Sequence, residues 1–290
     1  MKDFYKYLQV NQDYGYEELV VHNAGHTHIE PDSAYPPGRH PDHHQFSFSK
    51  GRVVDEYQLI YITEGEGKLQ TQTGGKFEIK AGDGFFIFPG EWHRYKPDSR
   101  LGWTENWVGF KGSNSFIRSS ENLVSRNNPV FRIGMDDRLI RQFSNIFEVV
   151  KSDYVGAEYV LSGSVIFLIG HILTHLKRQE LKITSQTDEI IMTAKSLLEN
   201  RFSEKVSLED IAGQLNISYV WFRTYFKKHT GYSPYDYLLN IRINHARLLL
   251  KNSSISVKEI SQSSGFESQQ QFSKTFKKKT GLTPLQFRNQ

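Results

Sequence analysis

The sequence predicts an α+β protein of two domains: a jelly-roll β-barrel followed by two helices, then an all-α domain with two helix-turn-helix motifs. Three observations lead to this expectation. Short β-rich runs separated by glycines fill residues 52–110, a helical spacing of apolar residues begins near residue 136, and one pattern occurs twice near the C-terminus. A chain of 290 residues is long enough to bury two separate cores.

The β-rich region contains the runs YQLIYIT, KLQTQT, KFEIK and FFIF, which are dominated by β-branched and aromatic residues. Glycines separate these runs: Gly65 and Gly67, Gly74 and Gly75, Gly82 and Gly84. Many short strands joined by glycine-containing turns are typical of an antiparallel sandwich or barrel. We therefore expect a barrel within an N-terminal domain of residues 1–135.

Residues 136–180 change to a helical periodicity. The apolar positions are Leu139, Ile140, Phe143, Ile146, Phe147 and Val150, then Val160, Ile166, Phe167, Ile169 and Leu173. This spacing predicts two amphipathic helices, which can pack on the barrel or on a second subunit, and we expect them to form a dimerisation segment. The polar stretch 181–189 shows no sustained pattern and is expected to link this segment to a C-terminal domain of residues 190–290.

Composition excludes several classes of protein. The chain has no cysteine, which excludes disulfides, thiolate metal clusters and cysteine nucleophiles and favours a reducing compartment. The N-terminus lacks the apolar core of a secretory signal. The longest apolar run, residues 165–169, is far shorter than the roughly 20 residues of a membrane span. These features predict a cytoplasmic protein with no membrane partner.

Charge is unevenly distributed along the chain. Residues 185–290 contain 15 Lys and Arg against 9 Asp and Glu, whereas the remainder contains 21 against 23. An excess of positive charge in the C-terminal region favours a polyanionic partner such as DNA. An ordinary solvated basic face would give the same count.

A repeat with a period of 50 residues is the most specific feature of the sequence. FKKHTGYSPYDY at residues 226–237 recurs as FKKKTGLTPLQF at residues 276–287. Duplicated units imply duplicated tasks. A short helix is predicted upstream of each copy, with Ser207 and Ser256 as N-caps, and glycine or asparagine suits the turn that follows it.

Each repeat then predicts a second helix with one buried face and one free face. Phenylalanines four residues apart, at 222 and 226 and again at 272 and 276, are expected to pack beneath it. The free faces carry side chains that suit DNA, because Gln pairs with adenine, Arg and Lys pair with guanine, and apolar groups meet thymine methyls. The expected DNA contacts are Tyr219, Val220, Arg223, Thr224 and Lys227, and Gln269, Gln270, Ser273, Lys274 and Lys277. Two helical hairpins with solvated faces are the alternative, which the duplicated caps and glycines disfavour.

The segment 206–288 resembles the DNA-binding domain of the AraC/XylS family of bacterial regulators. The resemblance rests on Leu208, Ile211, Ala212, Ser218, Phe222, Phe226, Gly231, Pro234, the stretch IRINHARLLL, Ile260 and GFESQQ at 265–270. It implies that a helix over residues 235–250 holds the two recognition helices in adjacent major grooves, about 34 Å apart. It also implies base contacts at eight of the ten expected DNA-contacting residues given above, that is, at all of them except Lys227 and Lys277. Ser261 and Ser264 replace the apolar residues usual in the family's second unit.

Residues 82–93 resemble the second motif of cupin barrels, a fold that also hosts metal enzymes. The first cupin motif would supply two histidines and a carboxylate, but this chain has Arg52, Val54 and Gln58 at those positions, so only His93 of four ligands remains. One imidazole does not hold a catalytic metal. We therefore expect a sensor with no metal, no cofactor and no enzymatic activity. The other N-terminal histidines are expected to form a surface cluster ahead of the barrel strands.

The N-terminal half also resembles the sensor of sugar-responsive AraC-type regulators, through residues 35–41, 51–52, 56–58 and 102–107. Alternation places Trp103, Glu105 and Trp107 on one face of a strand, and His93 and Tyr95 on one face of another. Facing into the barrel, they would offer aromatic plates and hydrogen-bonding groups to a polyhydroxylated ligand. The expected ligand-binding residues are Arg52, His93, Tyr95, Glu105 and Trp107. Core packing is the alternative for each aromatic, and Glu105 stands where arabinose-responsive members have histidine.

The combined features predict a dimeric transcription regulator that binds double-stranded DNA and responds to a mono- or oligosaccharide. The resemblance favours an activator of carbohydrate-utilisation genes and allows RNA polymerase as a partner. Two alternatives remain open: a constitutive DNA-binding protein whose barrel only dimerises, and a metal-dependent cupin enzyme fused to DNA-binding helices. Ligand-dependent stability tests the first alternative, and metal analysis tests the second.

Overall fold

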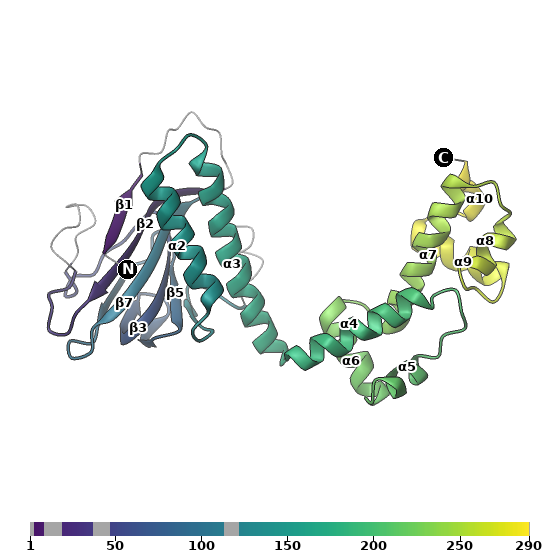
Figure 1. Ribbon diagram of the computed structural model, residues 1–290, viewed down its shortest axis with the longest axis horizontal. Helices are drawn as coiled ribbons and strands as arrows, with labels where there is room; N and C mark the ends of the chain where they lie inside the picture. Colours follow the sequence, from purple (N-terminus) through teal and green to yellow (C-terminus); the bar gives the residue numbers. More distant parts are fainter. Residues whose placement is uncertain (1–2, 9–18, 37–46, 113–121, 290) are drawn as a thin grey trace. The chain divides into compact units, whose positions relative to one another are not determined.

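The computed structural model describes residues 3–8, 19–36, 47–112 and 122–289 (Figure 1). The chain forms two compact units, residues 1–180 and residues 181–290. The first unit contains the β-structure and two helices, and the second unit is helical. This is the α+β architecture that the sequence predicts.

Eight antiparallel strands build the described part of the first unit. They are β1 (Phe4–Tyr7), β2 (Val20–Ile29), β3 (Tyr57–Thr71), β4 (Gly75–Lys80), β5 (Asp83–Ile87), β6 (His93–Pro97), β7 (Trp103–Lys111) and β8 (Val130–Arg132). The main path runs β1-β2-β7-β3-β5-β8. The first half of the long strand β3 pairs with β5 and β7, and its second half pairs with β4 and β6. Strand β3 therefore belongs to two layers, one with β5 and β7 and the other with β4 and β6. Because β3 joins these layers, the strands enclose an interior, as expected of a cupin-like barrel.

The sheet has two apolar faces with different partners. One face lines the barrel interior, with Ile60, Ile62, Phe85, Tyr95 and Trp107 among its buried residues. The opposite face is covered by two helices, α2 (Asp137–Ser152) and α3 (Ala157–Leu181) (Figure 1). The two predicted helices are therefore present, and both pack on the barrel.

The buried face of α3 differs from the expected one. Its core residues are Leu161, Val165, Leu168, Ile169 and Ile172. The expected positions Val160, Ile166 and Phe167 are instead exposed. Helix α3 is apolar on more than one side, so periodicity did not identify the face that meets the sheet. By length and composition it is apolar enough to cross a membrane, and 33% of its most apolar stretch is buried within the first unit.

The predicted linker 181–189 is mostly helical, which corrects the expectation of an irregular segment. Helix α4 (Ser185–Asn200) begins within it, and residues 182–184 alone lie between α3 and α4. Thr184 caps α4 by accepting a hydrogen bond from the Thr187 backbone N–H at 3.1 Å. The capped polar turn followed by Ile190 and Ile191 is the start of a helix. Its polar composition alone does not distinguish it from a linker.

The second unit contains two similar cores that share one long helix. The remaining helices are α5 (Leu208–Gln214), α6 (Tyr219–Thr230), α7 (Pro234–Asn252), α8 (Val257–Ser263), α9 (Gln269–Thr280) and α10 (Pro284–Arg288). The first core joins α4, α5 and α6 to the start of α7, and the second joins α8 and α9 to its end. Ser207 and Ser256 are the N-caps of α5 and α8, as predicted. Both helix-turn-helix motifs are confirmed.

Candidate functional site

The second helices of the two motifs, α6 and α9, are built alike. Ser218 and Ser268 cap their N-termini, and Gly231 and Gly281 end them in the left-handed conformation. Each helix buries its two phenylalanines completely, and in each pair the ring centroids lie 5.4 Å apart. The same internal packing therefore leaves the same outer face free on both helices.

Most of the predicted DNA contacts lie exposed on these outer faces. The exposed residues are Val220, Arg223, Thr224, Lys227, Gln269, Gln270, Lys274 and Lys277, whereas Tyr219 and Ser273 are half-buried. Val220 is 75% exposed in the first turn of α6, where no core packing explains an apolar side chain. It belongs to a hollow of about 690 Å³ that Arg223, Thr224 and Lys227 also line. A hollow with one apolar and several basic side chains suits the edge of a base and a phosphate.

Contacts between the two motifs hold them together alongside α7. The Arg242 guanidinium donates Nε–H to the Phe202 carbonyl and Nη2–H to the Glu204 carbonyl, both at 2.8 Å. At Gly265, which has a φ of +77°, a Cβ would lie 2.3 Å from the same Phe202 oxygen. The turn of the second motif therefore closes directly on the loop that precedes the first. Sequence reasoning singled out Gly265 for the turn but missed this contact and missed Arg242.

Inside the barrel, Arg52 lies against two of the predicted ligand-binding residues. Its Nε–H donates to His93 Nε2 at 3.3 Å, and its Nη2–H donates to the Tyr95 hydroxyl at 3.1 Å. His93 Nδ1 lies 3.0 Å from the Glu91 carbonyl oxygen, so the neutral imidazole carries its proton on Nδ1. Burial lowers the pKa of His93 to about 4, which keeps it neutral. His93 Nε2, the nitrogen with the lone pair that a metal would need, is thus engaged by the Arg52 guanidinium.

Glu105 joins this group through a tyrosine that sequence reasoning did not select. The Tyr35 hydroxyl donates to Glu105 Oε2 at 3.1 Å, and its ring lies 6.1 Å from that of Tyr95. Burial raises the pKa of Glu105 to about 7, although the Tyr35 hydrogen bond and the charge of Arg52 oppose the rise. The only sequence signal for Tyr35 was its place at the start of the sensor-like stretch 35–41.

Trp107 lies in the same interior core as Tyr95 and is 9% exposed. Its ring packs on Gly25 of β2, where a Cβ would lie 2.2 Å from it. The structure therefore brings all five predicted ligand-binding residues into or against one apolar interior. A glycine opposite a large aromatic was the signal that could have linked β2 to this site.

A polar pocket of about 500 Å³ adjoins this interior. Tyr7, Asn23, Val54 and Glu56 are among its lining residues, and Val54 also packs against the interior core. The Glu56 carboxylate is buried and accepts hydrogen bonds from Asn23 Nδ2 at 2.7 Å and from the Gln58 amide at 2.6 Å. A fixed, buried carboxylate at a pocket wall is a suitable acceptor for ligand hydroxyl groups.

Three of the N-terminal histidines lie on β2, which is itself a strand of the sheet. His26 is buried, with Nδ1 2.9 Å from Asn106 Oδ1, His22 is half-buried, and His28 is exposed. The expectation that they precede the strands is therefore wrong for all three, and a surface position is also wrong for His26, because strand pairing carries it into the sheet. His40, His43 and His44 lie outside the described residues.

Comparison with known proteins agrees with this architecture. Residues 37–161 match the family model of the AraC-like ligand binding domain, and residues 211–290 match a helix-turn-helix domain. The chain belongs to the AraC/XylS family. Both halves of this AraC/XylS-type chain thus carry the family's characteristic domains, in the order that the sequence predicts.

Several AraC/XylS-type relatives match along most of their length. The Msm operon regulatory protein of Streptococcus mutans is 28% identical over 82% of this chain and 86% of its own. The raffinose operon transcriptional regulatory protein of Pediococcus pentosaceus is 26% identical over 84% and 88%. The lactose operon transcription activator of Staphylococcus xylosus is 28% identical over 82% and 85%. The similarity therefore covers both domains of these regulators.

Proposed function

We propose that this chain is a transcription regulator that binds specific DNA through α6 and α9 and binds a carbohydrate in its N-terminal barrel. The duplicated, exposed faces of α6 and α9 carry the first part of the proposal. The names of two relatives, which mention the raffinose and lactose operons, support the second. Because its partner is DNA, we infer that the protein works in the cytoplasm.

The barrel interior suits a polyhydroxylated ligand. Tyr95, Trp103 and Trp107 offer aromatic faces on which the apolar side of a sugar ring packs. Arg52 and Glu105 offer a fixed donor and acceptor, and each already has a polar partner that a ligand hydroxyl could replace. On this proposal, the five predicted ligand-binding residues contact the sugar.

Dimerisation is a further part of the proposal. The exposed side of α3 carries Tyr159, Val160, Ile166 and Phe167, an apolar stripe on a helix whose other side is packed on the sheet. A second copy of α3 would cover such a stripe. Sedimentation velocity of Phe167→Glu is expected to give a monomer. An unchanged dimer would place the interface elsewhere.

Thermal stability against a panel of mono- and oligosaccharides tests the effector. A sugar that binds the native state alone raises the melting temperature. At one hundred times its Kd it increases the free energy of unfolding by about 2.7 kcal/mol. We expect a selective rise that Trp107→Ala abolishes and that Tyr154→Ala, an exposed control outside the barrel, retains. Glu105→Gln is a second variant of the binding site that preserves side-chain shape, so the test does not depend on the folding of Trp107→Ala. If no sugar stabilises a protein that still binds DNA, the barrel is a dimerisation module or takes another ligand.

A further inference from the structure

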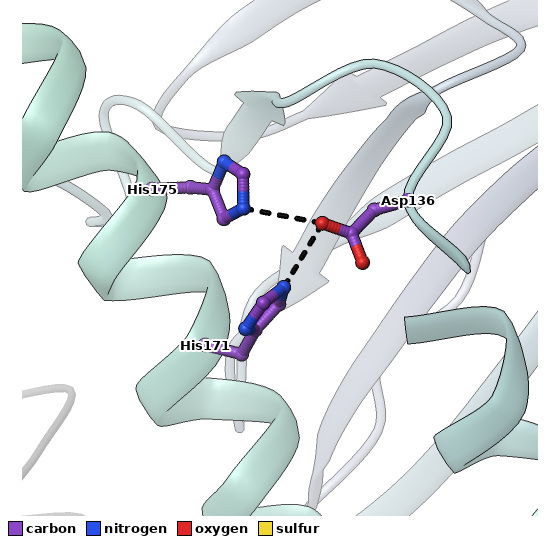
Figure 2. A group of neighbouring side chains, drawn as sticks. All are labelled: Asp136, His171 and His175. Carbon is purple, nitrogen blue, oxygen red and sulfur yellow. Dashed lines mark hydrogen bonds and ion pairs between the residues drawn. The ribbon is translucent and has the colours of Figure 1, made fainter. Parts of the chain in front are cut away.

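A cluster of two histidines and an aspartate lies outside the barrel interior, where α3 meets the start of α2. His171 and His175 are four residues apart on α3 and therefore share one face of the helix. Their Nε2 atoms lie 2.9 and 3.1 Å from Asp136 Oδ2 (Figure 2). The three ligand atoms all lie within 4.8 Å of one another.

The aspartate is held in place by contacts that do not involve the histidines. As the N-cap of α2, it accepts hydrogen bonds at Oδ1 from the backbone N–H groups of Arg138 and Leu139, at 2.9 and 3.1 Å. Its own N–H donates to the Tyr61 hydroxyl at 3.0 Å. The other carboxylate oxygen, Oδ2, which takes no part in the cap, therefore faces both imidazoles.

We propose that Asp136, His171 and His175 form a binding site for a divalent transition-metal ion, with Zn²⁺ as the reference ion. Imidazole nitrogens and a carboxylate oxygen are ligands that Zn²⁺ takes at about 2.0–2.2 Å. Two ligands of a tetrahedral ion then lie roughly 3.3 Å apart, a few tenths of an ångström beyond the distances to Asp136. Two imidazoles and one carboxylate leave at least one position for water.

The same side chains also hold one another without an ion, because His171 Nε2 is hydrogen-bonded to Asp136 Oδ2 and His175 Nε2 lies 3.1 Å from the same oxygen. On metal binding each imidazole presents its Nε2 lone pair, and a proton held on that nitrogen moves to Nδ1 or is released to solvent, so charge and atoms balance. Side-chain exposures of 12% for Asp136 and His171 and 36% for His175 leave a route from solvent while shielding the ion. The site is therefore accessible, and binding an ion requires the ligand atoms, which lie within 4.8 Å of one another, to close to the spacing of a tetrahedral ion.

Metal binding at this position would join three elements of the first unit. Asp136 caps the start of α2, the histidines lie in the second half of α3, and Tyr61 connects Asp136 to the core strand β3. Helix α3 ends at Leu181, where the second unit begins. The proposed ion therefore ties the second half of α3, the helix that leads into the second unit, to the start of α2.

Titration of the metal-free full-length protein with Zn²⁺, in competition with a chromophoric chelator, tests the proposal. We expect one equivalent to bind and its affinity to fall at least tenfold in His175→Gln and further in the double variant His171→Gln/His175→Gln. Co²⁺ is expected to give a visible d–d absorption band that both variants lose. Zn²⁺ is also expected to raise the melting temperature of the wild type more than that of the variants.

His229→Gln is the matched control. The His229 Nε2 atom lies 3.1 Å from Asp188 Oδ1, a similar histidine–aspartate pair outside the proposed ligand set. Its substitution is expected to leave Zn²⁺ affinity and the Co²⁺ band unchanged. Wild-type protein that binds no Zn²⁺, or binding of equal affinity in wild type and His175→Gln, would overturn the proposal and leave the cluster as an ion-pair network.

Discussion

Glu105 shows how the barrel interior treats a single ionisable side chain. It is 5% exposed and lies among aromatic rings, with Tyr35 as its hydrogen-bond donor. Burial favours the neutral acid and raises its pKa to about 7. Such a carboxyl group can donate or accept a hydrogen bond near neutral pH, so it can adapt to a bound hydroxyl group.

Replacing Glu105 with Gln is expected to change the pH dependence of stability. The folded-state pKa is raised from 4.5 to about 7, so the unfolded state ionises first and the folded protein loses stability as pH rises between these values. The loss amounts to about 3 kcal/mol at most, because one pKa unit corresponds to about 1.4 kcal/mol. Denaturant unfolding at pH 4.5 and pH 7.5 should show a smaller fall for the variant than for the wild type.

The wild type is the necessary reference, because His93 has a lowered pKa of about 4 and opposes the effect. A folded state that resists protonation of His93 loses stability as pH falls below 6.5. Since Glu105→Gln leaves His93 in place, the difference between the two proteins reports Glu105. Parallel pH profiles would contradict a buried, neutral carboxyl at this position.

Residue chemistry was predictable where it depended on local pattern and unpredictable where it depended on distant packing. Alternation along one strand was enough to group Glu105 with Trp107. Tyr35 reaches Glu105 from 70 positions away, and Gly25 makes room for Trp107 from a strand that the sequence pattern did not identify. Ser261, which replaces an apolar residue usual in the family's second unit, is buried with no hydrogen-bond partner for its hydroxyl among the described residues.

At the level of elements, the relation between α6 and α9 depends on more than the helix α7 that joins their motifs. Arg242 of α7 makes two hydrogen bonds to the loop before the first motif, and Gly265 closes the second motif on that loop. Hydrogen bonds from a charged group contribute about 1.5–3 kcal/mol. Arg242 is therefore a positioning residue for the spacing of the two recognition helices.

Arg242→Met is expected to weaken binding to DNA that contains both contact sites about tenfold, while binding to a single contact site changes little. Methionine keeps the apolar stem but loses both hydrogen bonds. The two motifs are then less fixed relative to each other, and ordering them on the DNA reduces the net binding free energy. Fluorescence anisotropy with the two DNA lengths measures the difference. Arg247→Met is the control, because Arg247 lies exposed on the same helix and contacts Phe287 of the second core. Equal losses in both variants would indicate lost charge, not lost positioning.

Elements with strong local signals matched the structure best. Caps, glycines and the 50-residue repeat located every helix of the two motifs, because those signals act within a few residues. The first turn of helix α4 was assigned to a linker, since it is polar. Strands β1 and β2 were missed, because their stability comes from pairing with each other and with β7, not from a glycine-bounded run of their own.

For the whole molecule, the proposed function requires sequence-specific DNA binding that differs from simple attraction to phosphate. A side chain that reads a base edge changes affinity for one sequence, whereas a lysine on a phosphate changes affinity for all. The outer faces of α6 and α9 contain both kinds of side chain. Arg223 and Gln270 are exposed at predicted base-contacting positions, and Lys277 lies in the last turn of α9.

Arg223→Ala and Gln270→Ala are therefore expected to weaken binding to a site recovered by selection from random DNA by about 1–3 kcal/mol, with a much smaller effect on random DNA. Lys277→Ala is expected to weaken both and to reduce the salt dependence of binding by about one released ion. Titrations at several salt concentrations measure both quantities. Lys258→Ala is a control of equal charge change, since Lys258 lies exposed on α8, outside the recognition faces. Equal losses on selected and random DNA for Arg223→Ala and Gln270→Ala would remove α6 and α9 from base recognition and leave the basic charge of the second unit as the source of affinity.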